Sequence, residues 1–410
     1  MYDFIRAAAT VPDIVVGNTT FNTNQIKKKI NEAIDKNADF IVFPELSISG
    51  ATCDDLFFQS TLLNNCKAAI KELLDYTQNL DCIVVVGAPI SILNKIYNCA
   101  VVLVKGKIAG IIPKTFLSDY RWFSSAETLQ IKEISSLSFG VKDDYAIPVG
   151  NNLIFDVPNT LKFGVEIGED LTSPIPPSTI LAMNGAELIL NISAIYETVT
   201  KREYIKNLVK HQSSAQLLGY VLTSAGSLES TTDYLFAGHS LIAEKGRILA
   251  QNDKPKTSNT LLINDIDIGK IRADRQKNKI SNYYTEECQY VELNIENIGS
   301  DATLYDIQQH PFIPENNSDC YERCLDIFRM QVLALSKRIS VTNSKMVIGV
   351  SGGLDSTLAI LVACETAKKL NKPLTDVVGI TMPCFGTSDR TYNNSLTLMK
   401  TLGSDTECFH

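Results

Sequence analysis

Apolar residues in the first 275 positions alternate between continuous runs, typical of buried strands, and stripes with helical spacing. One such stripe is formed by Ile26, Ile30, Ala33 and Ile34, and the run ADFIVFPEL follows it. Further runs, DCIVVVGAPI, NCAVVLV, LKFGVEI, AELILNI and GYVLTSAG, are separated by amphipathic stretches such as 61–76 and 201–217. Many strands with helices between them predict an α/β sandwich rather than a simple doubly wound sheet.

Two short segments carry the pattern of β-hairpins. In LVKGKIAGII and in IAEKGRILA, a glycine interrupts an apolar run that continues on the other side. Glycine adopts the left-handed conformations that tight hairpin turns require. The sequence therefore predicts tight turns at Gly106 and Gly246.

The apolar pattern decays after residue 275 and returns near residue 317. Residues 276–316 have little periodicity and many Asn, Asp and Pro residues, so we expect a linker between two domains. The second domain then begins with a helical stripe, formed by Leu325, Phe328, Val332, Leu335 and Ile339. The order that follows is a strand KMVIGV, a loop SGGLDS, a helix from about 357 and a strand DVVGITM.

Length and composition fit two domains in one chain. The 410 residues are 45% hydrophobic, enough for two cores. A formal net charge of −8 gives no electrostatic footprint for nucleic acid or an anionic membrane. No apolar run reaches the length of a membrane span, and the first residues lack a signal-peptide pattern, so we expect a cytoplasmic protein.

The ten cysteines are scattered through the chain without the even spacing of a disulfide scaffold. Cys320 and Cys324 are four residues apart, but no His or further Cys stands near them, so we expect no zinc site.

The segment GVSGGLDST, residues 349–357, stands between a predicted strand and a predicted helix. This placement aims backbone N–H groups and a helix N-terminus at one point, which suits a pyrophosphate group. We expect the ATP-binding residues to be Ser351, Gly352, Gly353, Leu354, Asp355 and Ser356. Asp355 is poorly placed for direct phosphate contact, so we expect it to orient the loop or to help hold Mg²⁺.

The phosphate loop resembles that of the N-type ATP pyrophosphatases, and GITMPCFGTSDRTYNN after it is similar to the ammonia-using NAD⁺ synthetases. The first 275 residues resemble the nitrilase superfamily, whose members have an α/β/β/α sandwich. Together the two halves resemble the glutamine-dependent NAD⁺ synthetases. The resemblance implies a nitrilase-like amidase domain at 1–275 and the first part of a Rossmann-like PP-loop domain at 317–410, which appears shorter than a complete domain of this type.

In this family the amidase half releases ammonia from glutamine with a Glu base, a Lys and a Cys nucleophile. Glu45 in FPELSISG matches the base, and Lys114 in IIPKTFL matches the lysine that stabilises the oxyanion. The family strand reads like G-x-E-I-C-E-D, whereas this chain reads GVEIGED, so Gly168 occupies the nucleophile position. A hydrogen side chain cannot form the thioester, and we expect no glutaminase activity.

Two further departures point the same way. KTFLSDYRWF is six residues shorter than the family segment, and Ile195 stands where the family has a glutamine-binding serine. Tyr120, Glu169 and Lys201 still match glutamine-binding positions, although Lys201 replaces an arginine and loses its bidentate grip. The three departures together favour a glutaminase that has decayed naturally over an engineered one.

The resemblance implies a ligase that uses ATP and Mg²⁺ to convert deamido-NAD⁺ to NAD⁺ through an acyl-adenylate. Its nitrogen source is glutamine in the family, and free ammonia is expected here. A homo-oligomer is implied by the nitrilase-like half alone. Two alternatives stay open: a non-catalytic nucleotide-binding or assembly module, and another PP-loop ATP pyrophosphatase.

Overall fold

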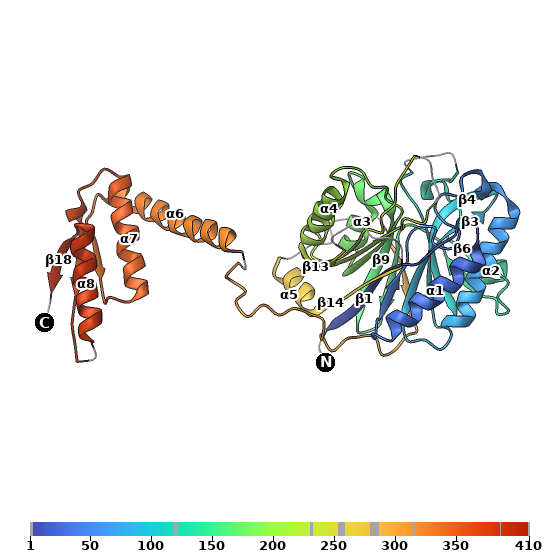
Figure 1. Cartoon of the computed structure of the whole chain (residues 1–410), viewed down its shortest axis with the longest axis horizontal. Helices are drawn as coiled ribbons and strands as arrows, with labels where there is room; N and C mark the ends of the chain where they lie inside the picture. Colours follow the sequence, from blue (N-terminus) through green and yellow to red (C-terminus); the bar gives the residue numbers. More distant parts are fainter. Residues whose placement is uncertain are drawn as a thin grey trace. The chain divides into compact units, whose positions relative to one another are not determined.

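The computed structural model describes residues 3–117, 122–229, 233–252, 259–278, 287–314, 316–385 and 387–408. The chain divides into two compact units, Met1–Asp306 and Ile307–His410, each with its own hydrophobic core. The first unit is two stacked sheets covered by helices, and the second is a smaller α/β unit (Figure 1).

Within the described residues, the first sheet of the larger unit has six strands. In spatial order they are β14 (Thr260–Asp267), β1 (Phe4–Val11), β2 (Phe40–Val42), β3 (Ile83–Ile92), β4 (Lys95–Val104) and β5 (Lys107–Pro113). The inner strands β1, β2 and β3 are parallel, and the outer strands pair antiparallel to them.

The second sheet has seven strands in the described part of the chain. They are β13 (Arg247–Gln251), β12 (Ser240–Glu244), β11 (Gly219–Ser224), β10 (Leu188–Ser193), β9 (Leu161–Ile167), β8 (Leu153–Val157) and β15 (Gln289–Glu292). Strands β9, β10 and β11 are parallel, so their carboxyl ends meet at one edge.

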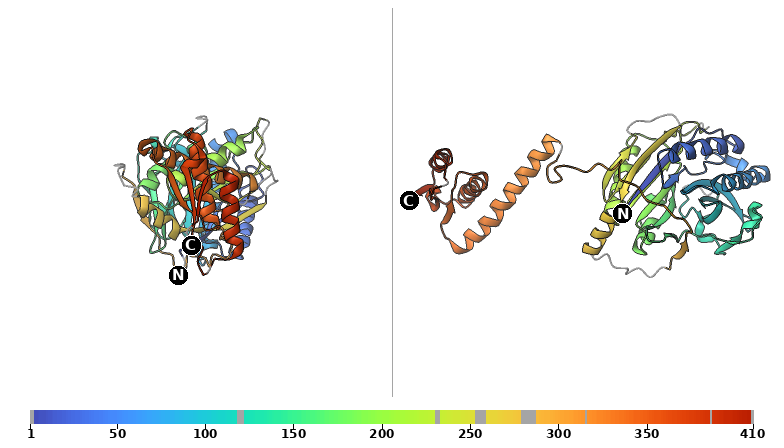
Figure 2. Two further views of the ribbon diagram at one scale, coloured as in Figure 1. Left: turned by 90° about the vertical axis from the view of Figure 1, so that its left-hand side faces the viewer. Right: turned by 90° about the horizontal axis from the view of Figure 1, so that it is seen from below.

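Helices cover the outer faces of both sheets. One face packs against α1 (Thr19–Ile34) and α2 (Ser60–Thr77), and the other against α3 (Pro177–Met183) and α4 (Lys201–Ala215). The sheets bury Phe40, Phe155 and Phe163 between them. The α/β/β/α sandwich predicted from the sequence is therefore confirmed, and Figure 2 shows α1 and α2 together on one side of it.

The predicted turns are also confirmed. Gly106 joins β4 to β5 with φ +74°, and Gly246 joins β12 to β13 with φ +84°. Smaller elements of this unit are η1 (Asp54–Phe58), η2 (Ala126–Thr128), β6 (Glu133–Ser135), η3 (Ser136–Phe139), β7 (Ala146–Pro148), η4 (Gly168–Thr172) and α5 (Ile268–Asn278).

The first unit extends further along the chain than the end expected at residue 275. Part of the expected linker 276–316 forms β15, which pairs in parallel with β8. Leu293 and Ile295 then enter the core between the sheets. Val291, Leu293 and Ile295 alternate with polar residues, which is a strand pattern, although it is short and lies within a polar stretch.

The second unit has a three-stranded parallel sheet in its described residues, in the order β16 (Met346–Gly349), β17 (Val377–Thr381) and β18 (Asp405–Cys408). Its helices are α6 (Asn317–Thr342), α7 (Leu354–Lys369) and α8 (Asp389–Leu402), with a short turn η5 (Leu374–Asp376). The predicted stripe of α6 buries Val332 and Ile339. None of the described helices is long and apolar enough to cross a membrane.

Candidate active site

Three candidate residues of the first unit meet where their strands end. Glu45 follows β2, Lys114 follows β5, and Gly168 follows β9. The Glu45 backbone N–H donates to the Ser193 carbonyl at the end of β10, 3.2 Å away. Because β2 and β10 belong to different sheets, this bond joins the two sheets at the site.

The Glu45 carboxylate is fully engaged. Its Oε1 accepts from Lys114 Nζ at 2.8 Å and from Asn98 Nδ2 at 2.5 Å, and its Oε2 accepts from the Ala194 backbone N–H at 2.8 Å. Glu45 is 4% exposed and Lys114 is 8% exposed. Such a buried pair keeps its geometry because each charge depends on the other.

Burial alone would lower the pKa of Lys114, because it disfavours the charged form. The carboxylates of Glu45 and Asp170 outweigh that effect, and the pKa lies above its ordinary value. Lys114 is therefore a charged donor, as oxyanion stabilisation requires.

Gly168 begins η4 with φ +56°, a conformation that side chains rarely adopt. A Cβ placed here would lie 2.5 Å from Glu45 Oε2 and 2.9 Å from Lys114 Nζ. The position thus faces the base and the lysine, as a nucleophile would. Glycine supplies no atom that could attack a carbonyl.

A buried polar cluster, formed by Asn191, Glu166 and Tyr220, holds the backbone carbonyl of Gly168. Asn191 Nδ2 donates to the Gly168 carbonyl at 3.3 Å and to Glu166 Oε1 at 3.3 Å. The Tyr220 hydroxyl donates to the same carboxylate oxygen. Burial raises the pKa of Glu166 and, more strongly, that of Tyr220.

Asp170 ties the turn after β9 to the segment that carries Lys114. Its carboxylate accepts from the backbone N–H groups of Phe116 at 2.7 Å and Thr115 at 3.3 Å. Burial raises the pKa of Asp170 to about 7, although Lys114 and these hydrogen bonds act in the opposite direction. Asp170 therefore titrates near neutral pH.

The expected glutamine-binding residues are only partly brought together. Glu169 and Lys201 form an ion pair of 3.6 Å, and the Lys201 ammonium lies over the Tyr196 ring at 5.4 Å. Ile195 is buried, and its backbone N–H donates to Ser224 Oγ at 2.9 Å. Tyr120 lies outside the described residues.

Two residues that touch the candidate base or lysine carried no sequence prediction. Asn98 bonds to Glu45, and Asp170 holds the segment after Lys114. Asp170 stands inside GVEIGED, two residues after Gly168, so its position was a usable signal. Asn98 opens the apolar run NCAVVLV but lies inside β4, so its sequence position carried no signal of a site.

The buried cysteines of the first unit are unsuited to replace the missing nucleophile. Burial raises the pKa of Cys53, Cys66 and Cys82 to about 12, and that of fully buried Cys99 also rises. A thiol attacks as its thiolate, so these groups are inert near neutral pH.

The loop after β16 carries the predicted phosphate-binding residues to the N-terminus of α7. Gly353 caps the helix, and the hydroxyls of Ser351 and Ser356 lie 3.2 Å apart beside it. Gly352 has φ +84°, and a Cβ there would lie 2.1 Å from the Thr391 carbonyl oxygen of α8. Only glycine fits this approach. Leu354, the first residue of α7, is 89% exposed.

Asp355 stands in the first turn of α7 and is exposed. The described residues contain no cluster of three or more His, Cys, Asp or Glu side chains that could hold a metal ion. A single carboxylate beside a phosphate loop fits Mg²⁺ bound mainly by nucleotide phosphates, and does not fit a dedicated protein cage.

Comparisons with known proteins agree with this division of the chain. Residues 6–276 match the carbon-nitrogen hydrolase family, and residues 327–410 match the NAD synthase family. The glutamine-dependent NAD(+) synthetase of Mycobacterium leprae is 31% identical over 411 aligned positions, which cover 98% of this chain and 60% of that protein. The synthetase of Aquifex aeolicus is 27% identical, over 95% of this chain and 63% of its own length. The chain thus spans about three fifths of these relatives.

Solved structures show the same fold. A glutamine-dependent NAD(+) synthetase from Cytophaga hutchinsonii superposes with a TM-score of 0.54 at 20% identity, covering 99% of this chain and 65% of that one. Yeast Nit3, a nitrilase superfamily member, superposes with a TM-score of 0.52 at 18% identity, covering 67% of this chain and 94% of its own. With a family match over residues 6–276, the chain belongs to the carbon-nitrogen hydrolase family, and an NAD synthase segment follows in the same polypeptide.

Proposed function

We propose that the protein converts deamido-NAD⁺ to NAD⁺, using ATP to activate the nicotinate carboxylate and ammonia to amidate it. The observation that carries the proposal is the Ser351–Ser356 loop at the N-terminus of α7, within a segment that matches the NAD synthase family. The match of 98% of the chain to a glutamine-dependent NAD(+) synthetase supports the same reaction.

The chemistry has two steps, and the loop serves the first. A carboxylate oxygen of deamido-NAD⁺ forms a bond to the α-phosphorus of ATP, and the bond from that phosphorus to the bridging oxygen breaks to release pyrophosphate. Backbone N–H groups at the start of α7 and the hydroxyls of Ser351 and Ser356 would hold the departing pyrophosphate. Ammonia then bonds to the carbonyl carbon, loses a proton, and AMP leaves with the electrons of the carbon–oxygen bond.

We assign Asp355 to Mg²⁺. Mg²⁺ neutralises charge on the phosphates when it is bound. Asp355 stands one residue into α7, beside the loop hydroxyls, where a carboxylate can contact a phosphate-bound cation. Asp355→Asn should therefore weaken nucleotide binding in the presence of Mg²⁺ more than in its absence.

We further propose that ammonia comes from solution. Gly168 lies against Glu45 and Lys114 and lacks the sulfur that would attack glutamine. Lys201 and Glu169 pair with each other, and Ile195 presents an apolar side chain where the family binds glutamine. The amidase half then has a structural role, and we propose that it also supports a homo-oligomer in the cytoplasm.

The synthetase assignment is tested by pyrophosphate release in the presence of ATP, Mg²⁺, deamido-NAD⁺ and ammonium chloride, with ATP binding followed by isothermal titration. We expect release that depends on deamido-NAD⁺ and is lost in Ser351→Ala/Ser356→Ala. Nucleotide binding without pyrophosphate release would contradict the enzyme and favour a nucleotide-binding module. Release that does not need deamido-NAD⁺ would favour another PP-loop pyrophosphatase.

A further inference from the structure

The last ten residues of the first unit, 297–306, are held differently from those before them, and we call this segment the strap. Residues 289–295 are fixed by pairing with β8 and by the burial of Leu293 and Ile295. The strap itself places most of its side chains in solvent, and Leu304 is 42% exposed. Its apolar contacts are Ile298, which is partly buried against the core between the sheets, and Tyr305, whose ring lies edge-on to Phe4, and its other contacts are polar.

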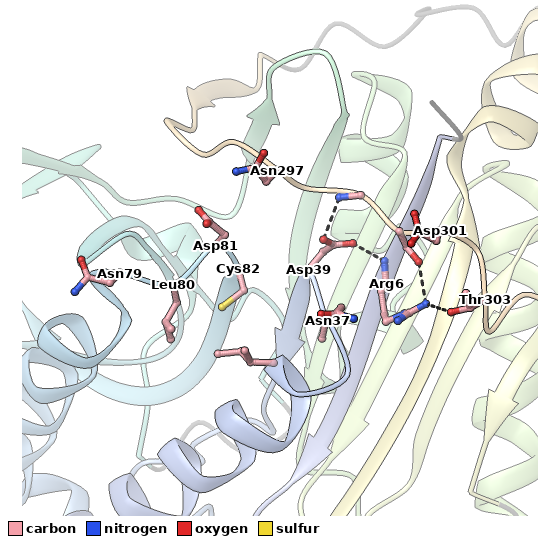
Figure 3. A pocket seen from close by; sticks show the side chains of 14 residues that line it. Arg6, Asn37, Asp39, Asn79, Leu80, Asp81, Cys82, Asn297, Asp301 and Thr303 are labelled. Atoms are coloured by element: carbon pink, nitrogen blue, oxygen red, sulfur yellow. Dashed lines mark hydrogen bonds between the residues drawn. The ribbon is translucent and has the colours of Figure 1, made fainter.

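Arg6 of β1 is the main attachment point. Its guanidinium forms a buried ion pair with Asp265 of β14, at 2.7 Å from Nε to Oδ1. The Nη2 atom also donates to Ser300 Oγ at 3.0 Å and to Thr303 Oγ1 at 2.6 Å, both in the strap (Figure 3). The charge of Arg6 is thus shared between the sheet and the strap.

Two carboxylates hold the strap backbone. Asp39 Oδ1 accepts from the Gly299 N–H at 3.0 Å, and Asp265 Oδ2 accepts from the Leu304 N–H at 2.8 Å. Hydrogen bonds to charged acceptors are about twice as strong as those between neutral groups. These two bonds are local and specific, so the strap can attach and detach as one piece.

The far end of the strap crosses to the second sheet. The Tyr305 hydroxyl donates to Glu244 Oε1 of β12 at 3.0 Å, and Arg247 of β13 pairs with Asp306 at 2.8 Å. Since Arg6 belongs to β1 of the first sheet, the strap contacts that sheet and also β12 and β13 of the second sheet.

Cavities separate the strap from the body of the unit between these contacts. One of about 640 Å³ lies between strap residues 297–303 and a wall that includes Asp39 and Cys82 (Figure 3). Another of about 270 Å³ adjoins residues 297–301 on the side of Asp3 and Asn159. A segment attached at separate points, with hollows between them, opens locally at lower free energy than the core.

The strap backbone is also strained. Ala302 has φ +57°, a left-handed conformation that costs energy for a residue with a Cβ, whereas Asn297 at φ +60° is a residue type that tolerates it. Attachment must overcome this cost, and release would recover it.

We propose that the strap is a separately releasable element, closed by Arg6, Asp39 and Asp265, and that its closure sets the length of free chain between the two units. When it is closed, residues 307–316 connect Asp306 to α6. When it is open, the connection becomes 297–316. Doubling the length of a flexible connection lowers the effective concentration of one unit at the other roughly threefold.

The test removes the side-chain bonds from Ser300 and Thr303 to Arg6, together with the bond from Ser300 Oγ to Asp265 Oδ1, and keeps both partners of the Arg6–Asp265 ion pair. In Ser300→Ala/Thr303→Val, we expect hydrogen exchange at the amides of Gly299 and Leu304 to become about tenfold faster. The amides of β1 and β15 should keep their protection. Glu296→Gln is the matched control, because Glu296 is exposed and lies just before the strap.

Small-angle X-ray scattering tests the second half of the proposal. Ten additional free residues should increase the mean span of the connection by about 7 Å in the open state. The radius of gyration should therefore rise in proportion to the open fraction that the exchange rates give, in the double variant but not in the control. Strap amides that exchange no faster than those of β1 in the unchanged protein would overturn separate release. A mostly open strap, by its exchange rates, without a change in scattering would overturn the control of the connection.

Discussion

Because of Gly168, the candidate site of the first unit keeps its charged side chains but has no nucleophile at this position. The base, the lysine and the turn are in place, with Glu45 and Lys114 2.8 Å apart beside the glycine. Acyl transfer needs a nucleophile as well, and the loss of that one atom removes the covalent step. The proposed loss of the amidase reaction is therefore compatible with a buried Glu45–Lys114 ion pair that persists.

A cysteine at position 168 should react with an alkylating reagent, but it should not restore glutamine hydrolysis. In Gly168→Cys, the new Cβ would lie 2.5 Å from Glu45 Oε2, so the Glu45 side chain must shift, and the Lys114 ammonium 2.9 Å from that Cβ favours the thiolate. We expect iodoacetamide to label residue 168 at least tenfold faster than buried Cys66. Glutamine hydrolysis should stay undetectable, because Ile195 and the paired Lys201 and Glu169 do not bind glutamine. Mass spectrometry and an ammonia-release assay measure the two results. A glutamyl thioester on the variant would contradict the account of the lost binding site.

Asp170 gives the first unit a pH dependence of known sign. Its pKa is raised to about 7 in the folded state, so its contribution to stability is present below pH 4 and is lost as the pH rises through about 7. Relative to Asp170→Asn, the unchanged protein should lose roughly 2 kcal/mol of unfolding free energy between pH 5.5 and 8. Urea unfolding at the two pH values measures this, and a difference that is constant with pH would refute the assignment.

At this scale, motifs predicted Glu45, Lys114 and Gly168 because each stands in a distinctive local pattern. The sequence could not predict that Asn98 contacts Glu45 across 53 positions, since that contact depends on how β2 and β4 are placed in the sheet. The same holds for the bond from Asp170 to the segment after Lys114.

Among the elements, the strand–loop–helix unit from β16 to α7 is where we propose that ATP binds, and its shape depends on Gly352. Gly352→Ala would force a Cβ to within 2.1 Å of the Thr391 carbonyl at φ +84°. We expect it to destabilise the second unit by about 2 kcal/mol and to abolish ATP binding.

Gly353→Ala is the matched control. The nearest atom to a Cβ at this position is Ser351 Oγ at 3.5 Å, an ordinary contact. Thermal unfolding should show a change of less than about 0.5 kcal/mol. Equal destabilisation by both substitutions would show that the approach of α8 is not what requires glycine at position 352.

Most elements were predictable because apolar periodicity reports burial directly. The runs ADFIVFPEL and DCIVVVGAPI became β2 and β3, and the stripe around Ile30 became α1. β15 begins a short alternating pattern of Val291, Leu293 and Ile295, and the polar residues on both sides of it led to its assignment to a linker. Its pairing with β8 joins segments more than 130 residues apart, a contact that no local pattern encodes.

For the whole molecule, the two units represent different chemistries in one chain. The first has the carbon-nitrogen hydrolase fold without a nucleophile at position 168, and the second has a glycine-rich loop at a helix N-terminus. If the first unit no longer supplies ammonia, the nitrogen of the product must come from free ammonium. Labelling glutamine and ammonium with different nitrogen isotopes shows which of the two supplies the amide nitrogen of NAD⁺.

The decisive measurement is the isotope content of NAD⁺ formed from deamido-NAD⁺ and ATP in the presence of both [amide-¹⁵N]glutamine and unlabelled ammonium chloride. The account predicts unlabelled NAD⁺, formation that rises with ammonium concentration, and no product from glutamine alone. NAD⁺ that carries ¹⁵N from glutamine would contradict it, because that result requires an amidase that works without a sulfur at position 168.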